Sequence, residues 1–139
     1  MSMPAIFFVA DRATAEKVRL NHSLPKESVA EWGSVDTLKL STLWTILTGG
    51  SEDPVELMDR FTEVRSSEEE WTHQIPDELV IRLATASPSE LSGAAERWVQ
   101  TEEMSGWSAS DGLEVLTDVQ RVARRAHQIH QPLFLYTSL

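Results

Sequence analysis

The stretch SASDGLEVLTDVQRVARRAHQIHQPLFLY, residues 108–136, holds the longest regular pattern in the chain and decides the fold. Its apolar residues recur at spacings of three and four, which is typical of one buried helix face; they are Val115, Val119, Val122, Ala126 and Ile129. Ser108 is placed to cap this helix, and Pro132 ends it. The run at 133–136 is apolar at every position, as expected for a strand covered on both faces. The sequence therefore predicts a long helix that leads directly into a buried strand.

A second apolar run, AIFFV at residues 5–9, has the β-branched and aromatic content of a strand. We expect this strand and the one at 133–137 to lie centrally in a small sheet, because an edge strand open to water would not tolerate apolar residues on both faces. Asp11 is expected to cap a helix that runs toward Asn21 and turns three side chains inward, namely Ala15, Val18 and Leu20.

Four shorter helices are predicted between these strands. They begin at residues that favour helix starts, namely Asp36 or Ser34, Asp53, Pro76 and Ser87. The first ends at the glycine pair 49–50, the second carries an inner face through Val64, and the fourth opens with a capping box completed by Glu90.

Two stretches, 24–35 and 65–74, lack a clear period, and we predict them as irregular apart from one helical turn after Pro25 and a short edge strand at 71–74. The chain is therefore predicted to be an α+β protein, with a small sheet that includes the N- and C-terminal strands and with five or six helices packed on it. Its 139 residues suit a single globular domain over 1–139, and 41% hydrophobic residues suffice for one core.

Composition makes several classes of protein improbable. The chain has no Cys, so disulfides, thiolate nucleophiles and cysteine-ligated metals are excluded. No apolar run approaches a membrane span and the first residues lack the basic region of a signal peptide, so we expect a cytoplasmic protein without membrane contact. The net charge is −10, and residues 41–120 hold four Lys or Arg against 17 Asp or Glu. Because this stretch would repel phosphates, no nucleic acid is expected as a partner.

The order of the segments resembles the YfbM-like family, a group of small bacterial α+β proteins of unknown function. The resemblance rests on the terminal strand and its capped helix, on LWTILTG at 43–49, on IPDEL at 75–79, on the helix from Ser87, and on the long helix that enters the last strand. The family usually carries a Trp where Leu40 stands here, whereas this chain has Trp44. The resemblance covers most of the chain as segment order; it implies the fold and supplies no catalytic residues.

The candidate binding residues come from predicted loops. Trp71 and His73 directly follow an acidic run that ends at Glu70, and Trp32 and Trp107 lie in other predicted loops. The three loop tryptophans could line a pocket or a partner-binding patch. A carboxylate beside a histidine can raise its pKa and form an acid–base pair. The alternative is a surface loop whose Trp packs on the helices, and we favour that alternative because a loop position is only a hint of function.

No cofactor and no metal site are predicted. His127 and His130 stand three residues apart on the long helix, but no third ligand is apparent and the neighbouring arginines would repel a cation. No residues are assigned a catalytic role, because no serine lies in a nucleophile-elbow pattern and the Gly49-Gly50 pair ends a helix where a phosphate loop would open one.

Two functions remain. The first is a non-enzymatic protein-interaction domain, of which an acidic inhibitor or immunity-type protein that covers a basic protein is one version. The second is a small-ligand-binding protein or a small hydrolase-like enzyme with a cleft near Trp71 and His73, in which Glu70 or Asp77 is the carboxylate. We favour the first because catalytic motifs are absent. The sequence identifies neither a specific ligand or partner nor the oligomeric state.

Overall fold

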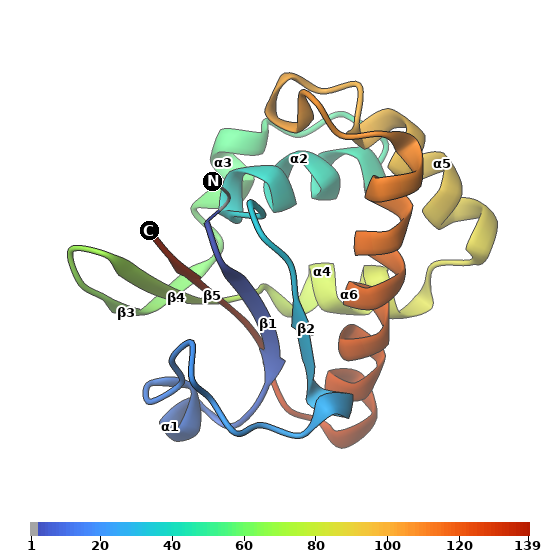
Figure 1. The fold of residues 1–139 in the computed structure, drawn as a ribbon. Coiled ribbons are helices and arrows are strands. Elements are labelled where there is room, and N and C mark those ends of the chain that lie inside the picture. Colours follow the sequence, from blue (N-terminus) through green and yellow to red (C-terminus); the bar gives the residue numbers. More distant parts are fainter. Residues whose placement is uncertain (1–2) are drawn as a thin grey trace.

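The computed structural model describes residues 3–139 and shows a five-stranded antiparallel sheet with helices on both faces (Figure 1). The strands are β1 (Ala5–Val9), β2 (Val29–Glu31), β3 (Thr62–Ser66), β4 (Glu70–Gln74) and β5 (Leu133–Ser138). They lie in the order β2-β1-β5-β4-β3. Both terminal strands therefore have a neighbour on each side, which confirms the predicted central position and the α+β class.

Six α-helices surround this sheet, in agreement with the prediction: α1 (Arg12–Ala15), α2 (Thr37–Leu47), α3 (Pro54–Met58), α4 (Asp77–Thr85), α5 (Pro88–Trp98) and α6 (Ala109–Ile129). Two 3-10 turns, η1 (Lys26–Ser28) and η2 (Glu102–Met104), complete the chain. Helices α2 to α6 cover one face of the sheet, and α1 lies on the other (Figure 1). No helix formed by residues 3–139 is long and apolar enough to cross a membrane.

Apolar side chains form two cores, one on each face. The main core joins Phe7 and Leu135 of the sheet to the inner sides of α2 to α6. The second core is smaller and consists of seven buried residues, namely Ile6, Phe8, Ala10, Ala15, Val18, Phe134 and Tyr136. Successive strand residues point to opposite faces, so the doubly apolar strands β1 and β5 supply both cores.

The predicted α6 stripe forms the centre of the main core. Val115, Val119 and Val122 are each at most 1% exposed. Ile129 is 37% exposed, so its predicted inward position is wrong. Ile129 is the last residue of α6, and the helix ends at His130, which adopts a left-handed conformation (φ 55°).

The predicted helix starts are also confirmed. The side chains of Asp36, Asp53 and Ser108 each accept a hydrogen bond from a first-turn backbone N–H, at 2.9–3.0 Å. Ser87 and Glu90 bond reciprocally at 3.1 and 3.0 Å as a capping box. These caps join residues two or three positions apart, which is why local sequence predicts them well.

Three predicted segments differ in the structure. Helix α1 stops at Ala15 and Leu20 is 52% exposed, because the Arg19 guanidinium binds the carbonyl oxygens of Glu16 and Val18 and turns the chain. The helix from Asp53 ends at Met58, so Val64 belongs to β3 instead. The stretch at 65–74, predicted as irregular apart from an edge strand at 71–74, lies largely in the β3–β4 hairpin, and β4 is an interior strand between β5 and β3. In the stretch 24–35, the predicted helical turn after Pro25 is confirmed as η1, and β2 follows it.

Candidate functional site

The β4 strand separates the residues that the sequence grouped together. His73 pairs with Leu135, which belongs to the main core, so Trp71 and His73 face the helices. Glu70 points to the opposite face, because alternate residues of a strand do so. The predicted acid–base pair of Glu70 and His73 is therefore not formed, and the prediction of a cleft that contains both residues is wrong.

His73 is half-buried on the helix face and lies opposite Glu63 of β3. Burial lowers the pKa of its imidazole below the ordinary value, and the nearby Glu63 charge opposes this effect. Its Nδ1 atom is buried and has no hydrogen-bond partner among residues 3–139. Asp77, the alternative carboxylate, is exposed at the start of α4. A half-buried neutral histidine in a strand is consistent with a structural role.

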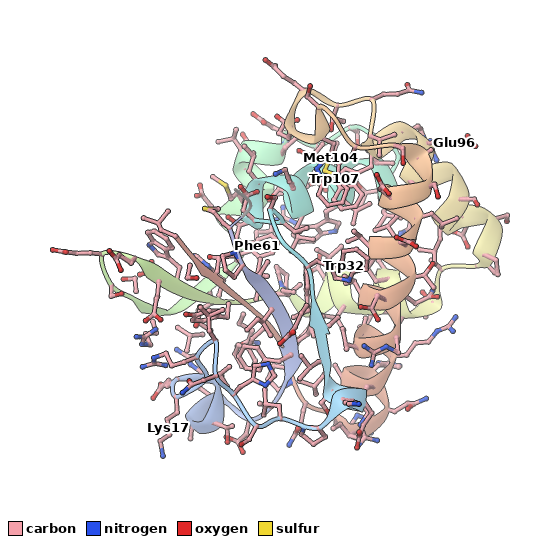
Figure 2. All side chains as sticks on the ribbon, in the orientation of Figure 1. Lys17, Trp32, Phe61, Glu96, Met104 and Trp107 are labelled. Atoms are coloured by element: carbon pink, nitrogen blue, oxygen red, sulfur yellow. The ribbon has the colours of Figure 1, made fainter. Side chains whose placement is uncertain are left out.

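The predicted loop tryptophans occupy different elements. Trp71 belongs to β4, where it is half-buried beside Thr137 and Ser66. Trp107 follows η2 near Met104 and is half-buried against the main core (Figure 2). Trp107 therefore serves the fold, and neither side chain lines the groove described below.

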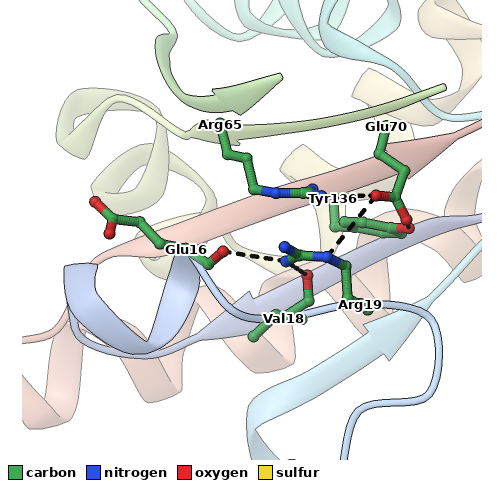
Figure 3. Close-up of polar contacts among 6 residues, drawn as sticks. All are labelled: Glu16, Val18, Arg19, Arg65, Glu70 and Tyr136. Atoms are coloured by element: carbon green, nitrogen blue, oxygen red, sulfur yellow. Dashed lines mark hydrogen bonds and ion pairs between the residues drawn. The ribbon is translucent and has the colours of Figure 1, made fainter. Parts of the chain in front are cut away.

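Glu70 is bound into a polar network on the second-core face (Figure 3). The Tyr136 hydroxyl donates to its Oε1 atom at 2.6 Å, and Arg65 Nη2 donates to Oε2 at 2.8 Å. These two hydrogen bonds hold the pKa of the Glu70 carboxyl below its ordinary value. Burial and the neighbouring Glu70 charge raise the pKa of Tyr136. The carboxylate is thus engaged within the fold and is not free to act as a base.

Arg19 extends this network to the segment after α1. Its Nε atom lies 3.8 Å from Glu70 Oε2, while Nη1 donates to the carbonyl oxygens of Glu16 and Val18 (Figure 3). The guanidinium thereby ties the covering segment to the β3–β4 hairpin. We conclude that the network closes the second core.

An open groove of about 1200 Å³ runs along the solvent-facing side of α6. We call it the α6 groove. Its helix wall extends from Ser110 to Gln128, a length of about 27 Å at the helical rise. Lys26 and Glu27 of η1 and Trp32, which follows β2, form the opposite wall. Figure 2 shows Trp32 between β2 and the middle of α6.

Hydrogen bonds fix the wall of the α6 groove that contains Trp32. Trp32 Nε1 donates to Asp118 Oδ2 at 2.8 Å, and Arg121 Nε donates to the other carboxylate oxygen at 3.0 Å. Arg121 also donates to the carbonyl oxygens of Lys26 and Val29, at 3.0 and 2.6 Å. The indole of Trp32 packs on the main core and is only half-buried. The groove is therefore preformed around a partly exposed tryptophan.

Three arginines give one end of the α6 groove a positive charge. Arg121, Arg124 and Arg125 line it, whereas the chain as a whole carries −10. Arg124 Nε donates to Ala84 O at 3.0 Å. Within the described residues 3–139, neither Arg124 nor Arg125 forms an ion pair, and Arg125 Nε is buried without an acceptor.

Sequence reasoning named Trp32 among the loop tryptophans that could line a pocket, but it did not place this residue against the long helix and so missed the groove. The helical pattern places the arginines away from the core stripe, where they form a separate stripe of one charge. Trp32 lies in a segment without periodicity, so nothing local indicates which helix it meets. Its partner Asp118 is 86 positions away along the chain.

His127 and His130 line a separate cavity of about 420 Å³, together with Asp77 of α4. Over residues 3–139, no group of three or more His, Cys, Asp or Glu side chains is placed to hold a metal ion. The cavity therefore offers no basis for assigning a metal.

A comparison of the chain with protein-family models, with curated proteins and with solved structures finds no match. The resemblance to the YfbM-like family stays a prediction.

Proposed function

We propose that this protein is a non-enzymatic protein-interaction domain that holds a segment of a partner in the α6 groove. The observation that carries the proposal is the half-buried Trp32, fixed by Asp118 in the wall of a long, preformed groove. Tryptophan and arginine are the residues most enriched where protein interfaces gain their affinity. At about 1200 Å³ the groove exceeds the usual 300–1000 Å³ of small-molecule pockets and is open along one side. These dimensions favour a chain segment over a small molecule.

The charge of the whole molecule favours a partner that is basic overall. The 22 Asp and Glu residues outnumber the 12 Lys and Arg residues, so the long-range field attracts positive charge. Such a field acts mainly on the association rate, and specificity comes from the groove contacts. An inhibitor or immunity-type protein that covers a basic protein is one form of this function.

The alternative of a small-ligand-binding protein or hydrolase near Trp71 and His73 has less support. Glu70 lies on the other face of β4, and the His73 imidazole is kept neutral by burial. A site there would lack Glu70, and the other predicted carboxylate, Asp77, is exposed at the start of α4.

Site-specific photocrosslinking tests the interaction proposal. A benzoylphenylalanine placed at Thr117, which is exposed in the groove, is compared with one at Glu96, which is exposed on α5 (Figure 2). We expect the Thr117 probe to capture a discrete protein that the Glu96 probe does not. That protein, purified, should bind at least tenfold more weakly to a folded Trp32→Ala variant. Equal capture from both positions, or unchanged binding by that variant, would contradict the proposal.

Salt dependence tests the basic character of the partner. Glu68 and Glu69 are exposed at the hairpin tip, so their replacement by Gln removes charge without touching the Glu70 network. With the captured partner, association should slow in this double variant and at high salt, while dissociation changes little. An association rate that rises or stays constant with added salt would exclude a basic partner.

A further inference from the structure

We propose that the partner segment presents carboxylates to Arg124 and Arg125 and an apolar side chain to Trp32. The proposal rests on the proposed function of the α6 groove and names the chemistry that the groove selects. Its occupant is an apolar and acidic peptide segment of the partner protein.

The pairing of the arginines supports this inference. Five of the nine arginines meet carboxylates within the fold, namely Arg12, Arg19, Arg60, Arg65 and Arg121. Arg82 and Arg97 also lack an ion pair among residues 3–139, but neither lines the α6 groove. Arg124 and Arg125 both line the α6 groove and have no ion-pair partner among residues 3–139. The Nε of Arg125 is buried and has no acceptor among the described residues. A carboxylate in the groove would pair with these guanidinium groups, whereas a cation would meet like charge.

The two ends of the α6 groove differ in charge. Glu114 and Asp118 belong to the N-terminal half of α6, and the arginines follow toward its C-terminal half. A carboxylate is therefore repelled at one end and attracted at the other, which fixes the direction of the segment. Attraction of a basic partner by the whole molecule is compatible with this pattern, because charges more than about 8 Å apart are screened at physiological salt.

Helix geometry sets the spacing of the recognised groups. Asp118 holds the Trp32 indole and precedes Arg125 by two helical turns, or about 10 Å. An extended segment covers that length in about three residues, and a helical segment in about seven. Leu113, one to two turns before Asp118, continues the apolar part of the groove.

Peptide selection tests the inference with a defined probe. The full chain is exposed to phage that display random 12-residue peptides, and the most enriched peptide is synthesised. We expect it to combine an aromatic or aliphatic residue with Asp or Glu at the spacing given above. Arg124→Gln with Arg125→Gln should weaken its binding at least tenfold. Arg97→Gln, which removes the same charge from exposed α5 and is not part of the groove, should leave binding unchanged.

The peptide itself supplies the second arm of the test. Changing its acidic residue to Gln should weaken binding to the unaltered protein and have little effect on the doubly substituted one, because the interaction is then already absent. This measurement stays valid even if the arginine substitutions disturb folding, because the loss of peptide binding is measured with the unaltered protein.

The failures of the two proposals are distinguishable by NMR of the Trp32 indole and the α6 amides. Two outcomes would overturn the carboxylate proposal and leave the interaction domain in place. In the first, peptides shift these signals but carry no acidic residue. In the second, the peptides bind the protein with Arg124→Gln and Arg125→Gln as well as they bind the unaltered protein. An absence of enriched peptides, or binding that leaves these signals unchanged, would overturn both.

Discussion

The two faces of the sheet are covered in different ways although the same strands supply both. On one face, β1 and β5 meet five helices that bury Phe7 and Leu135 completely. On the other, Phe8 and Phe134 are equally buried and stack with ring centroids 5.4 Å apart, yet their cover is the one-turn helix α1 and the chain that follows it. The comparison shows that an apolar strand face must be covered, but that the cover need not be regular.

Polar contacts take the place of helix packing on the second-core face. The cover is joined to the sheet by the network of Arg19, Glu70, Arg65 and Tyr136 described above. Apolar burial is non-directional and spread over many residues, whereas these contacts depend on a few atoms. The second-core face should therefore open locally before the main core unfolds.

The largest expected effect comes from the main core. Trp98 is fully buried and its Nε1 donates to Lys39 O at 3.0 Å. Trp98→Ala should lower the free energy of unfolding by about 3–5 kcal/mol, because a cavity forms among five helices. Phe8→Ala should cost less, about 3 kcal/mol, because the irregular cover can partly collapse. Urea denaturation measures the free energy of unfolding of both variants. A larger loss for Phe8→Ala than for Trp98→Ala would contradict the proposed difference between the two faces of the sheet.

A smaller effect is expected from the hydrogen bond that Tyr136 donates. Tyr136→Phe keeps the ring and removes the 2.6 Å bond to Glu70, so stability should fall by about 1–2 kcal/mol. Thr72→Val is the matched control, because the Thr72 hydroxyl is buried on the same face without a partner among the described residues. It should be neutral or stabilising. If thermal or chemical unfolding shows equal losses of stability for Tyr136→Phe and Thr72→Val, the hydrogen bond of the Tyr136 hydroxyl does not stabilise the fold.

Arg19→Ala should loosen the cover without destabilising the sheet. We expect amide hydrogen exchange at residues 15–22 to become about two- to fivefold faster, which corresponds to about 0.5–1 kcal/mol of local opening. Exchange in β1 and β5 should not change. Lys17→Ala, an exposed substitution in the same segment, should have no effect. Faster exchange throughout β5 in the Arg19 variant would instead mean that the two cores unfold as one unit.

The smallest effect concerns pH and the helix face of β4. Burial lowers the pKa of His73, so the unfolded chain binds a proton more readily than the folded chain. Stability should therefore be highest above the unfolded pKa of about 6.5 and decline as pH falls from there through the folded pKa. Unfolding titrations at pH 7.5, 6.5 and 5.5 should show this decline, and His73→Gln should reduce it. An identical decline in the variant would assign the proton to another group.

Local sequence accounts for most of the fold. The α6 stripe, the helix caps and the two doubly apolar strands each depend on residues within one or two turns of each other, and all were predicted. The β3–β4 hairpin was largely missed because its residues, TEVRS and EWTHQ, are mostly polar and lack clean alternation. The bulge between Glu63 and Arg65 disturbs that pattern further.

The candidate site was much less predictable. Glu70 and His73 are three positions apart, and a loop could have joined them, but pairing of β4 with β5 commits them to opposite faces. Trp32 and Asp118 are far apart in the sequence and carry no shared motif. A groove whose walls come from segments far apart in the sequence has no local sequence pattern, so it cannot be predicted before the fold is known.

The sequence by itself determined where the helices begin, which strands must be central, and that the molecule is acidic without cysteine chemistry. These properties follow from composition, periodicity and caps, all of which act over a few residues. Only the tertiary structure decided that Glu70 is bound in a network with Tyr136, and that Trp32 meets α6 in a groove that also contains two unpaired arginines. The physical reason is that such contacts depend on strand pairing and helix packing, which bring together side chains separated by tens of positions.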